Sequence, residues 1–276
     1  MALSLKPVEP ARGARWVGDA FRLFARRPLG FTMLFVMFLA VALFSSLLPL
    51  VGGVLQMMLL PLLSLGFMVA SQSVMLGGGV RPDAFVEPLR GAPERRNALL
   101  ALCALYGVAA IAILLLADVV SGGALAELQE LMARNDAPPA DVDALLADRG
   151  LAAAVLVGAG LGTLLSVVFW HAPALVHWGG QGVAQALFSS TLAVWRSKGA
   201  FFVYGLAWLA IVMAFGAAVA LVFGLIGASA VGSFLALPAG LLFSTVFYVS
   251  LIFTFHDSFG GAPSAADEPP AGLAEG

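Results

Sequence analysis

The amino-acid sequence predicts an all-α integral membrane protein with six transmembrane helices arranged as three helical hairpins. Three observations lead to this fold class. Of the 276 residues, 61% are hydrophobic and only 11% are charged, whereas soluble domains contain about 25% charged residues. The stretches 28–80 and 199–255, which are 53 and 57 residues long, contain no Asp, Glu, Lys, Arg or His. Finally, twelve of the 14 Lys and Arg residues fall on one side of the predicted helices.

The apolar stretches divide into six spans. One crossing of the bilayer takes about 20 helical residues, so each long stretch holds two spans, separated by "LLPLVGG" and by "FGLIGASAVGS". Two shorter apolar runs supply the middle pair. The first run is too long for a signal-peptide core and no small-residue cleavage site follows it, so we expect it to be retained. The predicted spans lie near 29–48, 54–76, 98–118, 151–177, 201–226 and 233–255.

The distribution of positive charge predicts the orientation. Six Lys and Arg residues precede the first span, four lie in the 77–97 loop and two in the 178–199 loop, against Arg134 and Arg149 on the other side. Loops rich in Lys and Arg remain in the cytoplasm. Both termini are therefore expected in the cytoplasm. The twelve Arg against two Lys are typical of a GC-rich bacterial genome, so the expected location is the bacterial inner membrane.

Residues 1–28 form a cytoplasmic tail with an amphipathic helix. In "ARWVGDAFRLFARRPLGF", a polar stripe at helical spacing opposes an apolar stripe that includes Trp16 and Leu23. Such a helix is expected to lie in the membrane interface and to contact membrane lipids, in particular anionic headgroups. Across the cytoplasmic side, the residues expected to contact headgroups are Arg15, Arg22, Arg26, Arg27, Arg95, Arg96, Arg196 and Lys198.

The basic corners also suggest a threefold repeat of an interfacial segment followed by a hairpin. Shifting the sequence by 170 residues lays "FARRPLGF" over "VWRSKGAF", and a shift of 102 lays "PLRGAPERRNALL" over "STLAVWRSKGAFF". The identities are few, and such corners also arise by chance at membrane boundaries. Both interpretations stay open at this point.

Two segments lie outside the six spans: one is an insertion within the predicted transmembrane domain, 29–258, and the other follows that domain. The periplasmic insertion 119–150 is acidic and has two short helical patterns, which predict a small helical cap. Its acidic groups could gather cations, but a solvated face is the simpler interpretation. The tail 259–276 has no hydrophobic periodicity and is expected to be disordered.

The stretch "VVFWHAPALVHWGG" raises the question of an intramembrane site, because polar groups inside a membrane are the first functional candidates. His171 and His177 could approach His256 and Asp257 at the cytoplasmic rim and form a polar cluster. The alternative is that these are boundary residues of the aromatic belt. The two histidines of the fourth span point about 120° apart on an ideal helix, and no carboxylate pair or thiol accompanies them. No metal, cofactor or catalytic residue is therefore expected.

Four segments together resemble a known family: "AFRLFARRPLGF" before the first span, "FWHAPALV" in the fourth, "AFFVYGLAWL" opening the fifth and "FHDSFG" closing the sixth. The chain is similar to uncharacterised proteobacterial six-span inner-membrane proteins of the YciC type. It also resembles the membrane domain attached to some glycerophosphodiester phosphodiesterases, without the catalytic domain. The family pattern more often has "FWFAP", so His171 is a departure from it. The resemblance implies no established activity.

Three functions are compatible with these features. The favoured one is a non-enzymatic scaffold, assembly or lipid-contacting component, because no catalytic set is present. A small-molecule or lipid transporter would need a midplane cavity near Pro61, Pro173 and Pro238, whose helices could be broken. An intramembrane enzyme would need the His/Asp cluster to converge. The expected partners are membrane lipids and an unidentified membrane protein, with no nucleic acid, and the oligomeric state is left open.

Overall fold

The structure is a computed structural model and describes residues 4–48, 51–133, 138–227, 232 and 234–260. Throughout these residues it is helical and contains no strand, which confirms the all-α fold class. Six helices are long and apolar enough to cross a membrane. They are α2 (Pro28–Ser46), α3 (Gly52–Met75), α4 (Pro93–Ser121), α7 (Arg149–Phe169) with its continuation α8 (Ala172–His177), α10 (Lys198–Leu225) and α12 (Ala236–Phe259).

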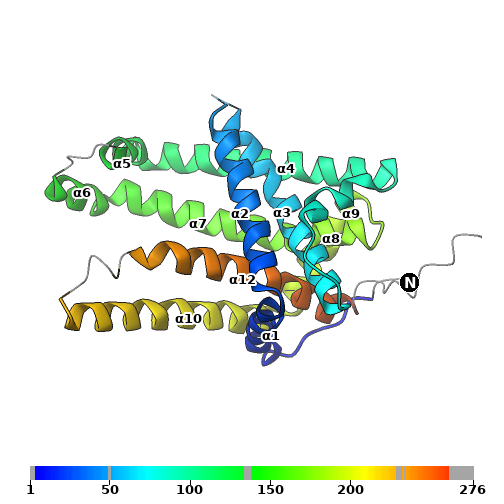
Figure 1. The fold of residues 1–276 in the computed structure, drawn as a ribbon. Coiled ribbons are helices and arrows are strands. Elements are labelled where there is room, and N and C mark those ends of the chain that lie inside the picture. The colour runs from blue at the N-terminus through cyan, green and yellow to red at the C-terminus, as the bar shows by residue number, and fades with distance from the viewer. Residues whose placement is uncertain (1–3, 49–50, 134–137, 228–231, 233, 261–276) are drawn as a thin grey trace, which may run out of the picture.

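Shorter helices lie at the two ends of the group formed by α4, α7, α10 and α12 (Figure 1). The amphipathic α1 (Arg12–Arg26), α8 and α9 (Val183–Arg196) lie toward the end that carries the chain's N-terminus. The short 3₁₀ helices η1 (Pro82–Phe85) and η2 (Glu87–Arg90) connect α3 to α4. At the opposite end, α5 (Ala124–Ala133) and α6 (Pro139–Leu146) form the predicted cap. The predicted disordered tail falls almost entirely outside the described residues.

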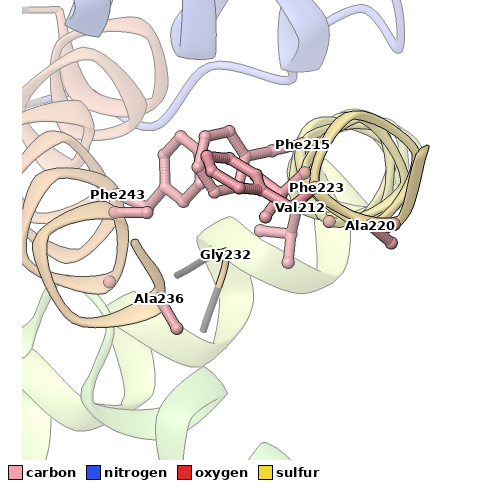
Figure 2. Close-up of a pocket in the computed structure, with 12 residues that line it drawn as sticks. Val212, Phe215, Ala220, Phe223, Gly232, Ala236 and Phe243 are labelled. Carbon is pink, nitrogen blue, oxygen red and sulfur yellow. The ribbon is translucent and has the colours of Figure 1, made fainter. Parts of the chain in front are cut away.

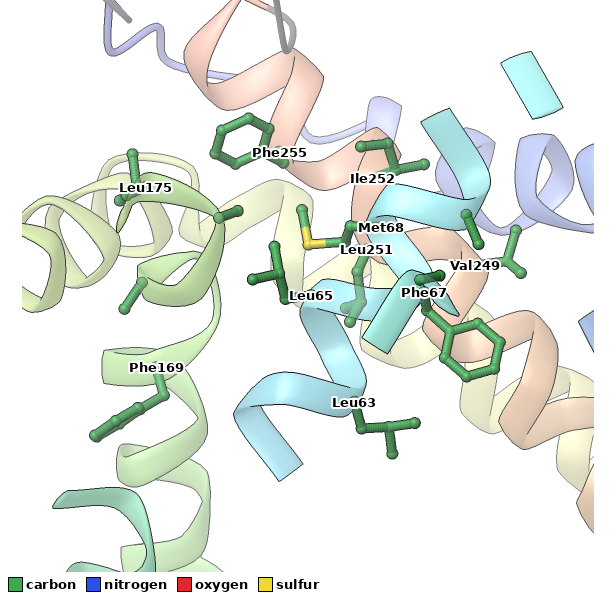
Figure 3. Packing of buried hydrophobic residues seen from close by; sticks show 14 of the residues in the cluster. Leu63, Leu65, Phe67, Met68, Phe169, Leu175, Val249, Leu251, Ile252 and Phe255 are labelled. Atoms are coloured by element: carbon green, nitrogen blue, oxygen red, sulfur yellow. The ribbon is translucent and has the colours of Figure 1, made fainter. Parts of the chain in front are cut away.

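Helix α3 is the centre of the bundle. It contacts α2, α4, α8 and α12, and its residues are buried on several sides, as expected for a helix that is apolar all round. In Figure 1, α2 and α3 cross the other long helices steeply, while α4 and α7 run alongside each other. Figure 3 shows the resulting core between α3, α12 and the α7–α8 corner, with Leu63, Leu65, Phe67, Met68, Phe169, Leu175, Val249, Leu251, Ile252 and Phe255.

The fourth predicted span is broken. Sequence reasoning placed one continuous helix over 151–177, but α7 ends at Phe169 and α8 begins at Ala172. Pro173 explains the position of the break, because it has no N–H to donate to the carbonyl of Phe169 four residues earlier. Pro238 has no such effect, since it lies in the first turn of α12, where a missing N–H breaks no helical hydrogen bond.

Helix α1 is the main departure from the expected arrangement. Its apolar stripe was expected to face lipid, but it packs between α10 and α12 instead. Trp16 and Ala20 are completely buried there. Gly13 allows the approach, because a Cβ at this position would lie 2.0 Å from the carbonyl oxygen of Ala200 on α10. Consequently α10 and α12, although consecutive in the bundle, make few direct contacts with each other.

Candidate functional site

A groove of about 1020 Å³ lies between α7 on one side and α10 and α12 on the other. It exists because α7 packs closely against α4 but makes few contacts with α10 or α12. No Asp, Glu, Lys, Arg or His lines it, and Thr163, Ser166 and Ser244 provide the hydroxyl groups of its middle part. Aromatic rings form most of the remaining wall: Tyr106, Trp170, Phe201, Tyr204, Trp208, Phe243, Phe247 and Tyr248.

The groove continues between α10 and α12 toward the capped end. A second cavity of about 510 Å³ shares Val212 and Phe243 with it. Figure 2 shows that phenylalanine rings from both helices project into this space. Phe215 and Phe243 meet edge to face with ring centroids 5.3 Å apart and are the contact between the two helices here. The two cavities therefore form one apolar surface along α10.

Glycine residues keep the groove open. Gly162 on α7 and Gly205 on α10 line it, and a Cβ at either position would meet no atom within 4 Å. Gly216 and Gly240 have the same property in the second cavity. A larger side chain at these positions would occupy the groove rather than disturb helix packing.

Hydrogen bonds between aromatic and hydroxyl side chains close the groove at its other end. The Tyr204 and Ser250 hydroxyls lie 2.7 Å apart, and Trp170 Nε1 donates to Thr254 Oγ1 over 3.2 Å. Trp16 of α1 covers this end, with its ring centroid 5.9 Å from that of Tyr204. The groove is thus open along its side and sealed toward the N-terminal side of the molecule.

An ion pair fixes α1 over this seal. Arg12 Nε donates to Asp257 Oδ2 over 2.6 Å, and Trp16 Nε1 donates to the same oxygen over 2.6 Å. The hydrogen bond to Asp257 raises the pKa of the Arg12 guanidinium above its usual value. The preceding segment adds a backbone hydrogen bond, since Lys6 N–H donates to Ser258 O over 2.8 Å. We call this set, Arg12, Trp16 and Asp257, the α1 clamp.

The four residues of the predicted polar cluster lie in different surroundings. His171 has no exposed surface and packs against the rings of Phe255 and Phe259 on α12. Asp257 follows Phe255 by two residues, which places it on roughly the opposite side of that helix. It accepts hydrogen bonds from Arg12 and Trp16 of α1 instead.

The other two histidines are separate again. His177 lies against Trp178, with ring centroids 5.5 Å apart, and lines a polar crevice near α3. The ring centroid of His256 lies 6.5 Å from that of Phe255, and its Nε2 is buried without a hydrogen-bond partner in the described chain. Among the described residues, no three His, Cys, Asp or Glu side chains are arranged to hold a metal ion.

The predicted headgroup contacts share one feature, which is exposure. They form a rim at the end of the molecule that also carries α1, α8 and α9, and we call this set the basic rim. Its members are Arg15, Arg22, Arg26, Arg27, Arg95, Arg96, Arg196 and Lys198, all exposed. Of these, Arg22 pairs with Asp19 over 2.9 Å and Lys198 lies 5.1 Å from the Trp195 ring centroid.

Comparison with known proteins shows the family to which the chain belongs. It is 33% identical over 267 residues to the probable inner membrane protein BTH_II0599 of Burkholderia thailandensis, covering 95% of this chain and 97% of that protein. The chain belongs to that family. With its six apolar helices, it is an integral, multi-pass inner-membrane protein, as predicted. No family model matches the sequence, and no solved structure matches it.

Two features of this inner-membrane protein were missed from the sequence. Asp257 was selected, but its partner Arg12 was not, because the two are 245 positions apart. The groove was missed because its lining residues look like those that face lipid. The available signal was the concentration of Trp and Tyr in "AFFVYGLAWL" and "FSTVFYVS", on two neighbouring helices.

Proposed function

We propose that this protein is a non-enzymatic, lipid-contacting component of the inner membrane whose lateral groove holds an acyl chain of a membrane lipid. The observation that carries this proposal is the groove between α7, α10 and α12, which is apolar, uncharged and open along its side. Its volume of about 1020 Å³ lies at the upper end of the range of small-molecule sites, about 300–1,000 Å³.

The shape of the groove favours binding over transport. A transport path must connect both sides of the membrane, whereas this groove is closed at one end by the Tyr204–Ser250 and Trp170–Thr254 hydrogen bonds. Its walls also carry no Asp, Glu, His or Lys that could act as the acid or base in hydrolysis of a lipid or activate one of its hydroxyl groups. Scaffold and assembly roles remain compatible with a bound lipid.

Two further elements belong to the proposal. The basic rim faces the cytoplasm, with both termini on that side, and its exposed cations contact anionic headgroups. The motifs described above support a kinship with the YciC type. Reporter fusions at each terminus test the orientation: a fluorescent protein should be active and a periplasmic alkaline phosphatase inactive at both ends.

The experiment for the groove is photo-crosslinking in proteoliposomes with a phospholipid that carries a diazirine in its acyl chain. Crosslinks should map to peptides of α7, α10 and α12 that line the groove. The variants Gly162→Leu and Gly205→Leu fill it and should reduce those crosslinks several-fold.

Gly160→Leu is the matched control. Gly160 lies on the same helix as Gly162, is exposed and has open space around its missing Cβ, but it does not line the groove. This variant should crosslink like the native protein. Equal crosslinking in all three variants, or labels spread evenly over every lipid-facing helix, would refute the proposal.

A further inference from the structure

A separate crevice, which is polar and has a volume of about 660 Å³, lies at the basic rim. It is on the side of the molecule formed by α3 and the η1–η2 segment. It is bounded by the last turns of α3, the following glycine turn, η1, η2, the first turn of α4 and the end of α8. It shares no lining residue with the lateral groove. The two are therefore independent sites.

The turn after α3 gives the crevice a fixed wall. Gly77 has φ +86°, a conformation that side chains rarely adopt, and it ends the helix. Gly78 N–H then donates to Ser73 O over 2.8 Å, and Ser73 Oγ donates to Gly79 O over 2.9 Å. A Cβ on Gly78 would lie 2.6 Å from Ser73 Oγ, so this turn depends on glycine.

The opposite wall, η1, is fixed in two ways. Phe85 packs its ring onto α3 where Gly66 has no side chain. Asp83 accepts two hydrogen bonds from Arg81, at 2.6 and 3.0 Å, which lower the pKa of its carboxyl group below the usual value. Since Asp83 neutralises Arg81, that arginine contributes little free positive charge to the crevice.

The remaining charged groups of the crevice are not used by the protein itself. In the described chain, neither Arg95 nor Glu87 takes part in an ion pair. His177 Nδ1 is buried and has no hydrogen-bond partner there. A guanidinium and a carboxylate without ion-pair partners thus line one cavity together with the imidazole of His177.

The other lining residues connect this polar part to the membrane. Val69 and Leu76 supply apolar wall on α3, and Trp178 adds an amphipathic ring of the kind that settles at the membrane interface. A ligand suited to this crevice therefore carries a negative and a positive group close together, with an apolar remainder. Glu87 disfavours a purely anionic headgroup, because a second negative charge beside it would be repelled.

We propose that this crevice binds a phospholipid through a phosphoethanolamine headgroup. Arg95 and His177 hold the phosphate, because a guanidinium and an imidazole N–H both donate hydrogen bonds to phosphate oxygens. Glu87 accepts hydrogen bonds from the primary ammonium group. The acyl chains leave along the apolar wall of α3. The site goes beyond the lateral groove, because it selects a lipid by its headgroup.

The test measures lipid preference by native mass spectrometry of the delipidated full-length protein in detergent. Phosphatidylethanolamine, phosphatidylcholine and phosphatidylglycerol with identical acyl chains are added in competition. Native protein should retain the ethanolamine lipid in preference to both others. Glu87→Gln should abolish the preference for the primary amine over the choline lipid, while Arg95→Gln should weaken binding of every phospholipid at this site by about tenfold, as expected for the loss of a charged hydrogen bond.

Arg149→Gln is the control, since Arg149 is also an exposed arginine, lies at the start of α7, and belongs to neither the crevice nor the basic rim. The groove variant Gly162→Leu should also keep the headgroup preference, so failure here is distinguishable from failure of the proposed function. Glycerophosphoethanolamine, without acyl chains, serves as the soluble probe and should compete weakly. The proposal is overturned if the anionic lipid is preferred, if the soluble probe binds as tightly as the lipid, or if Glu87→Gln leaves the preference unchanged.

Discussion

Replacing His171 by phenylalanine should stabilise the protein. The imidazole has no exposed surface, and neither ring nitrogen has a hydrogen-bond partner in the described chain. Its neighbours are the rings of Phe201, Phe255 and Phe259, with centroids 6.0, 5.8 and 5.5 Å away. A neutral imidazole carries one donor and one acceptor. The protein therefore buries two polar nitrogen atoms here, and neither forms a hydrogen bond within the described chain.

The magnitude follows from these contacts. Each unsatisfied buried group costs about 1–3 kcal/mol, and the larger phenyl ring costs about 1–3 kcal/mol in overpacking. At mid-range, the two unsatisfied nitrogens cost about 4 kcal/mol together and overpacking costs about 2 kcal/mol, which leaves a gain of about 2 kcal/mol for His171→Phe. For a domain of about 150–250 residues, 1 kcal/mol corresponds to about 2–4 °C in Tm. A rise of several degrees is expected.

Thermal unfolding in detergent, followed with a thiol-reactive fluorophore, measures this change. Cys103 is the single cysteine of the chain and is buried, so labelling reports loss of the folded state. His171→Ala is the comparison, because it removes the ring contacts as well and should lower Tm. If His171→Phe lowers Tm by a similar amount, the imidazole nitrogens have a partner, such as a buried water, and the reasoning is wrong.

Three further predictions concern α1 and the η1 segment. Asp257→Asn should lower stability by about 1.5–3 kcal/mol, the range for a hydrogen bond to a charged group, and a double-mutant cycle with Arg12→Gln should show that the two losses are not additive. Gly13→Ala should lower Tm, because its Cβ would meet an α10 carbonyl, whereas Gly18→Ala, with open space around it, should not. Hydrogen bonds from Arg81 to the ionised Asp83 carboxylate lower its pKa and stabilise η1. This stabilisation is fully present above the usual carboxyl pKa of about 4 and is lost as pH falls through the lower pKa of the folded state. The protection factor of the η1 amides, which corrects hydrogen exchange for the intrinsic rate at each pH, should therefore fall at acidic pH in the native protein and already be low at neutral pH in Asp83→Asn.

The sequence predicted the helices well because their signals are local. An uninterrupted apolar run of about 20 residues is sufficient to define a span, and the stripe of α1 is visible in its own residues. The surface against which that stripe packs is not local information. The residues around Trp16 form the same apolar stripe whether that stripe faces lipid or packs against α10. Its burial between two helices could therefore be learned only from the structure.

The candidate sites show a similar division. The exposure of the basic-rim cations was predictable, because Lys and Arg side chains are rarely buried without a partner. Grouping His171 with Asp257 was reasonable from depth alone, but depth does not specify which side of α12 each residue contacts. The lateral groove was out of reach for another reason: lipid and the groove are both apolar, so the same residue types line each of them.

The α1 clamp and the groove depend on each other through α10. This helix contacts the rest of the protein mainly through α1, near its N-terminal end, and α1 in turn is fixed to Asp257 of α12. Toward the capped end, its closest aromatic contact with α12 is the Phe215–Phe243 pair. A lipid chain that extends from the groove into the adjoining cavity contacts the outer half of α10, from Val212 to Gly224, which packs little against the rest of the protein. Binding to the folded state alone stabilises that state. Occupancy should therefore protect the outer half of α10 from hydrogen exchange more than its inner half, where α1 already holds it.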